Sequence, residues 1–368
     1  MAHYEIEIWD KTGKPLADIR QYCSGLSWSK TLNGSETLTF TIDLNKFESL
    51  LKTLGYATTP LDFFEVGRCD IRVKRNGTYI LGTNVYRFTY STNDPSVSLT
   101  VECVGYLNFY KTQYVTASFS QVPQHEILWQ VINQCNQKPG GDYGVRQGTH
   151  SGAVVRRDRN YTRKEVATLI QQMANVINGC DFSFTPDKKF NTYEAKGTYR
   201  PSIVLYYGDG GNIQSFSFSR SIEKVANYVY GLGSGNGDDV VSHEAEDVDS
   251  ETYLYRRERI ITWNSVTRDD TITEHTNSAL HALKDIIEIP TITVRNDYLD
   301  LSVVDVGDTV IVNLNSNLSL KHVNGDYRIE GIDCSVDEND SETVRLTFDN
   351  LDIDSIIENQ DSEEENGS

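Results

Sequence analysis

A glycine-rich run over residues 231–237 is the first segment whose composition could do chemistry, because Gly-Leu-Gly-Ser-Gly-Asn-Gly could wrap a phosphate group. Loops that bind phosphate have the spacing G-x-G-x-x-G or G-x-x-x-x-G-K-[ST] and lead into a helix, whose first N–H groups bind the anion. The run has neither spacing, and the acidic pair Asp238-Asp239 follows it where a phosphate would lie. We therefore expect a flexible connecting loop and no bound cofactor.

Acidic and histidine residues offer metal ligands at a few places. The turns 247–251 and 337–340 carry several carboxylates, but neither has the alternating ligands, central glycine and closing glutamate of an EF-hand. His275 and His281 are six positions apart, which puts them on different faces of a helix rather than at the i, i+4 spacing of a zinc pair. The six cysteines show no C-x-x-C spacing and lie mostly in apolar runs. The sequence predicts no metal site, and it predicts reduced, buried cysteines.

Catalytic groups are the remaining chemistry. Ser24-Gly25 and Ser151-Gly152 are not part of a G-x-S-x-G nucleophile motif. Two carboxylates that meet in space could hydrolyse a glycosidic bond, and 53 acidic residues supply many pairs, so a cell-wall glycan hydrolase or peptidase stays open as an alternative. Another alternative is a glycan-binding β-protein with exposed tryptophans, for which the candidates are Trp9, Trp28, Trp129 and Trp263. We expect a protein without a catalytic residue.

One basic cluster stands out in a chain whose formal net charge is −19. Its members are Arg146, Arg156, Arg157, Arg159, Arg163 and Lys164. One interpretation is a solvated loop that is balanced by Asp158 and Glu165. The other is a docking patch for an acidic neighbour such as another subunit, because complementary potentials steer and align assembling surfaces. The acidity of the whole chain argues against a protein that binds nucleic acid through a basic face.

Strands must position most of these residues. The 368-residue chain has 21 Tyr against 2 Met, which favours strands over a helical bundle. Alternating strands joined by Asn-Gly turns at 33–34 and 76–77 fill the first hundred residues and return after residue 213. Apolar spacing predicts helices over 124–136, 161–178 and 273–289. No apolar run approaches a membrane span, and the N-terminus has no basic and apolar leader.

The predicted fold class is mainly β with an α+β insertion. Two tube-like antiparallel β-barrel domains, residues 1–115 and 215–351, flank a small α+β domain, residues 116–214. We expect the acidic, low-complexity tail, residues 352–368, to be disordered, because it has little apolar surface to bury.

A repeated motif order supports two similar barrels. The segment 306–348 places a Val-Gly pair, an alternating strand, a Tyr-Arg pair and a last strand in the order already found over 66–102. The positions that define the repeat are Gly67, Tyr86 and Arg87 in the first copy and Gly307, Tyr327 and Arg328 in the second. The spacing changes fall in turns, where length changes are tolerated.

The order of motifs from 226–231 through a helix over 273–289 to 306–310 and 327–332 resembles the tail-hub proteins of long-tailed bacteriophages. These include the trimeric hubs of contractile baseplates and the N-terminal structural module of siphophage tail-associated proteins. The resemblance implies a homotrimer whose two barrels per chain match a sixfold tail tube. Many siphophage relatives continue into a lytic or fibre region where this chain has its acidic tail, which puts lytic activity in doubt.

The resemblance also implies partners and a location. The partners would be other tail proteins, namely a distal tail or tube protein, a tape measure protein and a fibre or spike. DNA would pass through the lumen without specific binding. The protein would be made in the cytoplasm of the host bacterium and would lie at the tail tip of the virion.

Overall fold

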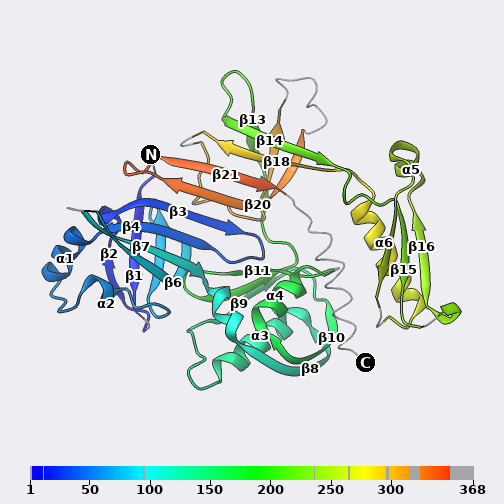
Figure 1. Ribbon diagram of the computed structural model, residues 1–368, viewed down its shortest axis with the longest axis horizontal. Coiled ribbons are helices and arrows are strands. Elements are labelled where there is room, and N and C mark those ends of the chain that lie inside the picture. Colours follow the sequence, from blue (N-terminus) through cyan, green and yellow to red (C-terminus); the bar gives the residue numbers. More distant parts are fainter. Residues whose placement is uncertain are drawn as a thin grey trace.

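The computed structural model describes residues 2–10, 12–93, 96–176, 178–235, 237–263, 266–295, 298–314 and 324–348. Strands predominate among them, so the predicted mainly β composition is confirmed (Figure 1). The acidic segment 352–368 lies outside the described residues.

The N-terminal part is built from alternating strands. In its first strand Tyr4, Ile6 and Ile8 are each 0% exposed, and the residues between them reach the surface. Asn33 and Asn76 adopt positive φ angles of 54° and 50° in the predicted Asn-Gly turns, which both join neighbouring strands. The elements are β1 (Tyr4–Trp9), β2 (Pro15–Asp18), η1 (Arg20–Tyr22), β3 (Cys23–Thr31), β4 (Thr37–Asp43), α1 (Leu44–Thr53), α2 (Pro60–Phe63), β5 (Asp70–Arg75), β6 (Thr78–Asn93) and β7 (Ser96–Gly105).

A compact α+β region follows. Its elements are η2 (Tyr106–Thr112), β8 (Tyr114–Pro123), α3 (Gln124–Asn136), β9 (Arg146–Ser151), β10 (Arg156–Glu165), α4 (Val166–Ala174), β11 (Asp181–Phe184) and β12 (Lys189–Tyr193). Helix α3 confirms the helix predicted over 124–136. Helix α4 begins at Val166 rather than near residue 161, because the charged residues before it pair with β8 as a strand.

The chain then returns to the large sheet and leaves it once. The returning strands are β13 (Tyr199–Tyr206), β14 (Ile213–Ser221), β18 (Ile287–Val294), β19 (Thr309–Asn313), β20 (Gly325–Val336) and β21 (Glu342–Phe348). The excursion, at the right of Figure 1, contains β15 (Tyr228–Leu232), η3 (Gly237–Asp239), β16 (Ser242–Glu246), α5 (Val248–Leu254), β17 (Glu258–Thr262) and α6 (Asp269–Leu283). Helix α6 ends six residues before the predicted limit of 289, because β18 begins at Ile287.

One sheet of 13 strands runs through both halves of the described chain. Its order is β14-β18-β21-β20-β3-β4-β7-β6-β5-β1-β2, with β19 attached to β20 and β13 attached to β19. The antiparallel ladder between β20 and β3 joins the two halves. The prediction of two closed barrels needs correction: neither half closes on itself among the described residues. Strand β3 pairs with β4 on one edge. Closure of the first half would need its other edge to pair within that half, and this edge pairs with β20 instead.

Three separate hydrophobic clusters fill the interior of the described chain. The largest is shared by both halves of the sheet and contains residues such as Phe40 and Leu346, both 0% exposed. The second belongs to the α+β region, where Ile170 is among its fully buried members. The third lies under α6 around Trp263. The common first cluster means that the two halves of the sheet are one packed body.

Candidate assembly interface

Two strand triplets repeat the same hydrogen-bonding pattern, β5–β6–β7 in the first half and β19–β20–β21 in the second. The N–H of Gly67 donates to the Val85 carbonyl at 2.7 Å, and the N–H of Gly307 donates to the Ile329 carbonyl at 2.7 Å. Both glycines have positive φ angles, 76° and 94°, which side chains rarely adopt. These glycines therefore begin the triplets in the same conformation.

The same irregularity follows in both triplets. The ladder of β6 on β7 skips Tyr86, and the ladder of β20 on β21 skips Glu330. The next residue in each strand, Arg87 or Gly331, resumes the pairing. Because a β-bulge bends its strand and fixes which face each later residue takes, a shared bulge gives both triplets the same shape.

The ladders assign different equivalent residues from those chosen by sequence motif. Tyr327 and Arg328 lie opposite β19 as Thr83 and Asn84 lie opposite β5. Thr83 and Asn84 come three residues before Tyr86 and Arg87, the pair to which the sequence motif matched Tyr327 and Arg328. The physical reason is that backbone pairing sets equivalence in a sheet, whereas two similar side chains recur on both strands at unrelated registers.

A buried ion pair ties the two halves together. The Arg75 guanidinium binds both Glu342 carboxylate oxygens, with Nε–Oε1 at 2.6 Å and Nη2–Oε2 at 2.9 Å. The Tyr4 hydroxyl donates a third hydrogen bond to the same carboxylate. The carboxylate raises the pKa of Arg75 through hydrogen bonding, and burial is the largest cause that raises the pKa of Tyr4. No sequence pattern indicated this pair, since its members lie 267 positions apart and neither belongs to a motif.

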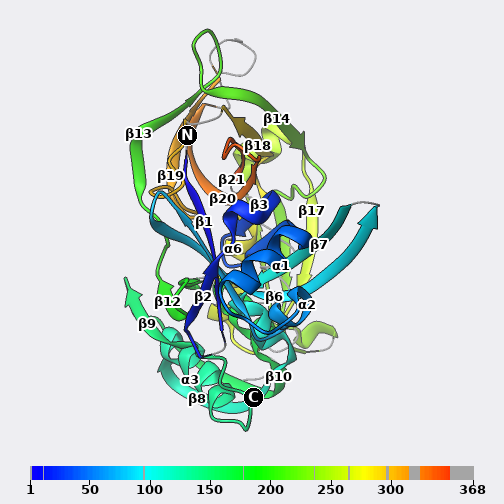
Figure 2. The same cartoon turned by 90° about the vertical axis from the view of Figure 1, so that its left-hand side faces the viewer.

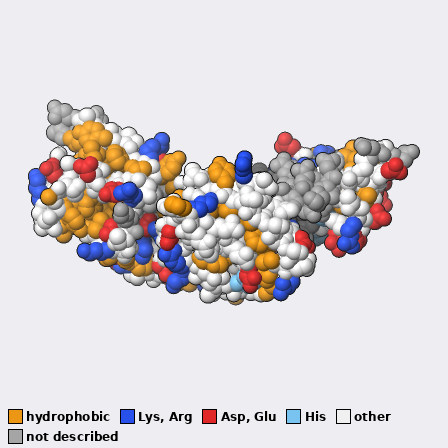
Figure 3. Space-filling model, turned by 90° about the horizontal axis from the view of Figure 1, so that it is seen from below, with side chains coloured by type: hydrophobic (Ala, Val, Ile, Leu, Met, Phe, Trp, Pro, Cys, Tyr) orange, Lys and Arg blue, Asp and Glu red, His pale blue; other side chains and the backbone are white. Residues whose placement is uncertain are grey.

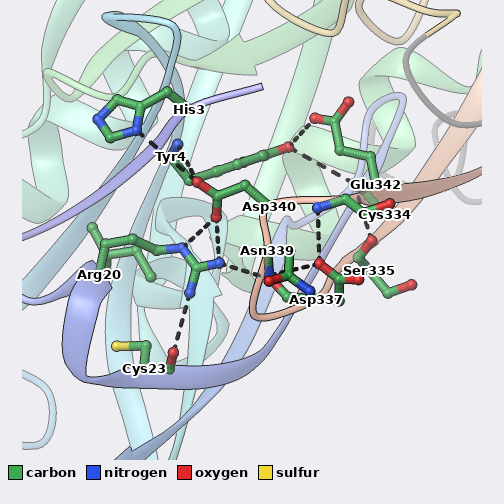
Figure 4. A network of polar contacts seen from close by, with 12 residues as sticks. His3, Tyr4, Arg20, Cys23, Cys334, Ser335, Asp337, Asn339, Asp340 and Glu342 are labelled. Atoms are coloured by element: carbon green, nitrogen blue, oxygen red, sulfur yellow. Dashed lines mark hydrogen bonds and ion pairs between the residues drawn. The ribbon is translucent and has the colours of Figure 1, made fainter. Parts of the chain in front are cut away.

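Beside it, a surface network fastens the β20–β21 turn to the N-terminal strands (Figure 4). Arg20 Nε donates to the Asp340 carboxylate at 3.0 Å, and its Nη2 donates to the Asp337 carbonyl at 2.9 Å. Its Nη1 donates to the Cys23 carbonyl at 3.1 Å. One arginine thus spans the acidic turn at residues 337–340, and that turn serves as a structural contact.

A second charged junction joins the sheet to the segment after β12. Lys30 of β3 and Lys196 both bind Asp305, at 2.8 and 2.9 Å. Desolvation opposes the shift, but the two lysines hold the pKa of Asp305 far below its usual range. Nearby, burial raises the pKa of Glu36 to about 7, and its Oε2 has no hydrogen-bond partner. These charges line a cavity of about 230 Å³ where the two halves and the α+β region meet.

The structure divides the predicted basic docking patch between two sheets. Arg146 lies on β9 and pairs with Asp142 at 2.8 Å. The others lie on β10, which is a strand rather than the expected loop. Along β10, exposed Arg156 alternates with Arg157, whose Nε donates to Gln124 at 2.9 Å. The remaining members are Arg159, Arg163 and Lys164.

The underside of the molecule shows Lys and Arg side chains interspersed with Asp and Glu (Figure 3). The basic residues therefore do not make one continuous surface in this view.

The cysteines and two of the candidate tryptophans lie in the interior of the protein. All six cysteines are buried and none forms a disulfide, and the burial predicted for them is confirmed. Trp28 and Trp263 are 3% and 0% exposed, so these two cannot form the exposed platform of a glycan-binding site. Among the described residues, no three His, Cys, Asp or Glu side chains gather in a way that could hold a metal ion. None of the helices in the described part is long and apolar enough to span a membrane.

Several backbone edges of the sheet lack a partner in the described chain, among them those of β14 and β6. Strand β14 pairs only with β18, at the end of the strand order. Beyond its bulge, β6 pairs with β7 on one side, and no ladder forms on its other side. Figure 2 shows the β6–β7 hairpin reaching past the rest of the sheet. Tyr86 and Tyr90, on this part of β6, are 56% and 51% exposed. Exposed edges of this length invite pairing with another strand.

Comparison with known proteins gives a consistent picture. Residues 146–349 match the model of a family described as Siphovirus ReqiPepy6 Gp37-like protein. No curated protein matches the sequence significantly.

Solved structures share the fold over almost the whole chain. A tail protein from Neisseria meningitidis MC58 is 13% identical, with a TM-score of 0.65 over 97% of this chain and 98% of its own. The 43 kDa tail protein of prophage MuSo2 from Shewanella oneidensis is 11% identical, with a TM-score of 0.64 over 95% and 99%. The E. coli c3393 protein, a type VI secretion component described as similar to the T4 tail proteins gp27 and gp5, is 10% identical, with a TM-score of 0.53 over 89% and 73%. At these identities the likeness is one of fold.

Proposed function

The chain belongs to the Siphovirus ReqiPepy6 Gp37-like family of phage tail proteins, and from this premise we propose that it is a tail-tip or baseplate hub which assembles as a ring of three copies. The observation that carries the proposal is the repeated β5–β6–β7 and β19–β20–β21 ladder. Each copy would supply two similar units, so three copies would give six units around one axis. Such a ring has the symmetry needed to close or continue a sixfold tail tube.

The open edges of the sheet support a ring. A cyclic arrangement satisfies every head-to-tail contact, whereas an open arc leaves one unsatisfied edge at each end. In this proposal the tube-like barrel is completed between copies rather than inside each predicted barrel domain. The α+β region, predicted as residues 116–214, and the β15–β17 excursion would then lie outside the tube.

The proposed role is mechanical and electrostatic. A formal charge of −19 favours a lumen that repels phosphate groups, so that DNA passes without sticking. The exposed part of the basic patch, around Arg156 and Arg163, would dock an acidic neighbour. That neighbour would be another copy or another tail protein, of which the distal tail or tube protein, the tape measure and the fibre or spike are the candidates. The proposal assigns no catalytic residue to this chain.

Mass and shape in solution test the proposal. Light scattering on the purified protein, over a range of concentrations, should give a species near three times 41.6 kDa. Negative-stain images of that species should show rings with six similar lobes around a channel. A stable dimer or tetramer of closed symmetry would contradict the hub, because neither provides six equivalent units.

A further inference from the structure

We infer that β14 of one copy pairs antiparallel with the free edge of β6 in the next copy, residues 216–221 against residues 87–92. The inference rests on the proposed ring and adds to it the contact that closes the ring and the register of that contact. Its partner is a second copy of this chain. The ladder that already joins the two halves inside each chain gives both the strands and the register.

The first step is the internal joint. Beyond its bulge, β20 has β21 on one side and β3 on the other. Residues 331–336 lie opposite residues 26–31, from Gly331 with Thr31 to Val336 with Leu26. This joint makes the sheet continuous across the two halves of one chain.

The second step is the equivalent half of β6. Its residues 87–92 pair with β7 after a bulge, and residues 331–336 of β20 pair with β21 after the equivalent bulge. On the other side, where β20 has β3, β6 has no ladder partner among the described residues. Burial follows this difference, since Cys334 is 2% exposed and Tyr90, at the equivalent position, is 51% exposed. The edge of β6 thus lacks the strand that its counterpart has.

The third step identifies the strand that would fill this place. Both β3 and β14 meet their partner with a register irregularity near the start, between Ser24 and Ser27 and between Ile213 and Ser215. Those partners, β4 and β18, in turn pair with β7 and β21. By place in the sheet, β14 is therefore the counterpart of β3, and the described chain offers β14 no second partner.

The register follows from the same ladders. Thr39 of β4 faces the β7 residue that is the first to pair with β6 beyond the bulge. Thr291 of β18 faces the β21 residue that is the first to pair with β20 beyond its bulge. Thr39 and Thr291 are therefore equivalent. Ser27 faces Thr39, and Ser217 faces Thr291, so Ser217 corresponds to Ser27. Copying the β20–β3 register then gives six pairs, which are 87 with 221, 88 with 220, 89 with 219, 90 with 218, 91 with 217 and 92 with 216.

Paired cysteines test the register with the same four positions in two combinations. Ser91, Ser217, Arg87 and Ser221 are exposed, so their replacement leaves the fold intact. The double variants Ser91→Cys with Ser217→Cys and Arg87→Cys with Ser221→Cys are in register. The swapped variants Ser91→Cys with Ser221→Cys and Arg87→Cys with Ser217→Cys place the thiols four residues apart, about 13 Å along the strands, which is beyond disulfide reach.

Mild oxidation followed by non-reducing gels and light scattering gives the outcome. Both in-register variants should convert to covalent species up to three chains, and the swapped variants and the wild type, whose cysteines are buried, should not. A threefold mass in solution without in-register links would overturn the strand pairing and leave the hub standing. The same result would arise if another tail protein covered these edges. A protein without links that never forms rings would overturn both the pairing and the hub.

Discussion

Replacing Glu342 with Gln should destabilise the protein far more than its single lost charge suggests, because the charge is buried. Glu342 is 1% exposed and Arg75 is 4% exposed, and they share two hydrogen bonds across the joint between the halves. The amide keeps the shape of the side chain. It leaves the Arg75 charge facing a neutral group that water cannot reach.

The size of the loss follows from that burial. Removing one partner of a buried ion pair costs about 3–5 kcal/mol, because the remaining charge stays desolvated. Asp300 also pairs with Arg75, but its side chain is 57% exposed, so solvent screens its compensation. Against a typical folding free energy of about 5–15 kcal/mol, the variant should unfold at a much lower urea concentration.

An exposed pair in the same sheet provides the control. Arg87 and Glu102 also form a bidentate pair, with Nη2 at 2.8 and 2.7 Å from the two oxygens, but their side chains are 64% and 33% exposed. Glu102→Gln should therefore cost only about 0.2–1 kcal/mol. Urea unfolding followed by tryptophan fluorescence measures both variants. Losses of equal size would refute the argument that burial sets the cost.

Two further predictions concern buried groups. Burial raises the pKa of Glu36 from 4.5 to about 7 in the folded state, so the folded protein holds this proton more tightly and stability should fall as pH rises from 4.5 through 7, by up to roughly 3 kcal/mol. Glu36→Gln should flatten that part of the pH profile, and an unchanged slope would exclude Glu36 as its source. Burial also raises the pKa of Cys69 to about 11 and of Cys334 to about 12, so a thiol reagent should find no cysteine in the native protein and six in denaturant without reductant. Fewer than six would reveal disulfides.

Local chemistry explains what the sequence could predict. The Asn33 and Asn76 turns follow from residues that tolerate positive φ, and their neighbours alternate with the period of a strand. Helix α3 follows from an apolar stripe that is complete within its own thirteen residues. In both cases the decisive interactions lie close together in the chain.

Interactions from elsewhere decided the errors. Thr162 to Glu165 has the pattern of a helix capping box, yet its last two residues pair with β8, and Lys164 lies opposite Val115. The end of α6 was placed too late because Ile287 continues its apolar spacing but belongs to β18. Propensity gives way where a distant strand offers a full ladder of hydrogen bonds.

The barrels illustrate a deeper limit of sequence analysis. A strand that ends a sheet has the same alternation whether its partner lies in its own chain or in another copy, so β3 and β14 cannot be told apart by pattern. The structure distinguishes the two strands, since β3 pairs with β20 whereas β14 pairs only with β18 among the described residues. If the ring is correct, both edges make the same kind of joint, one inside a chain and one between chains. The prediction would then have found the right strands for a barrel. Its error would be that it closed each barrel within one chain, whereas the barrel closes between copies.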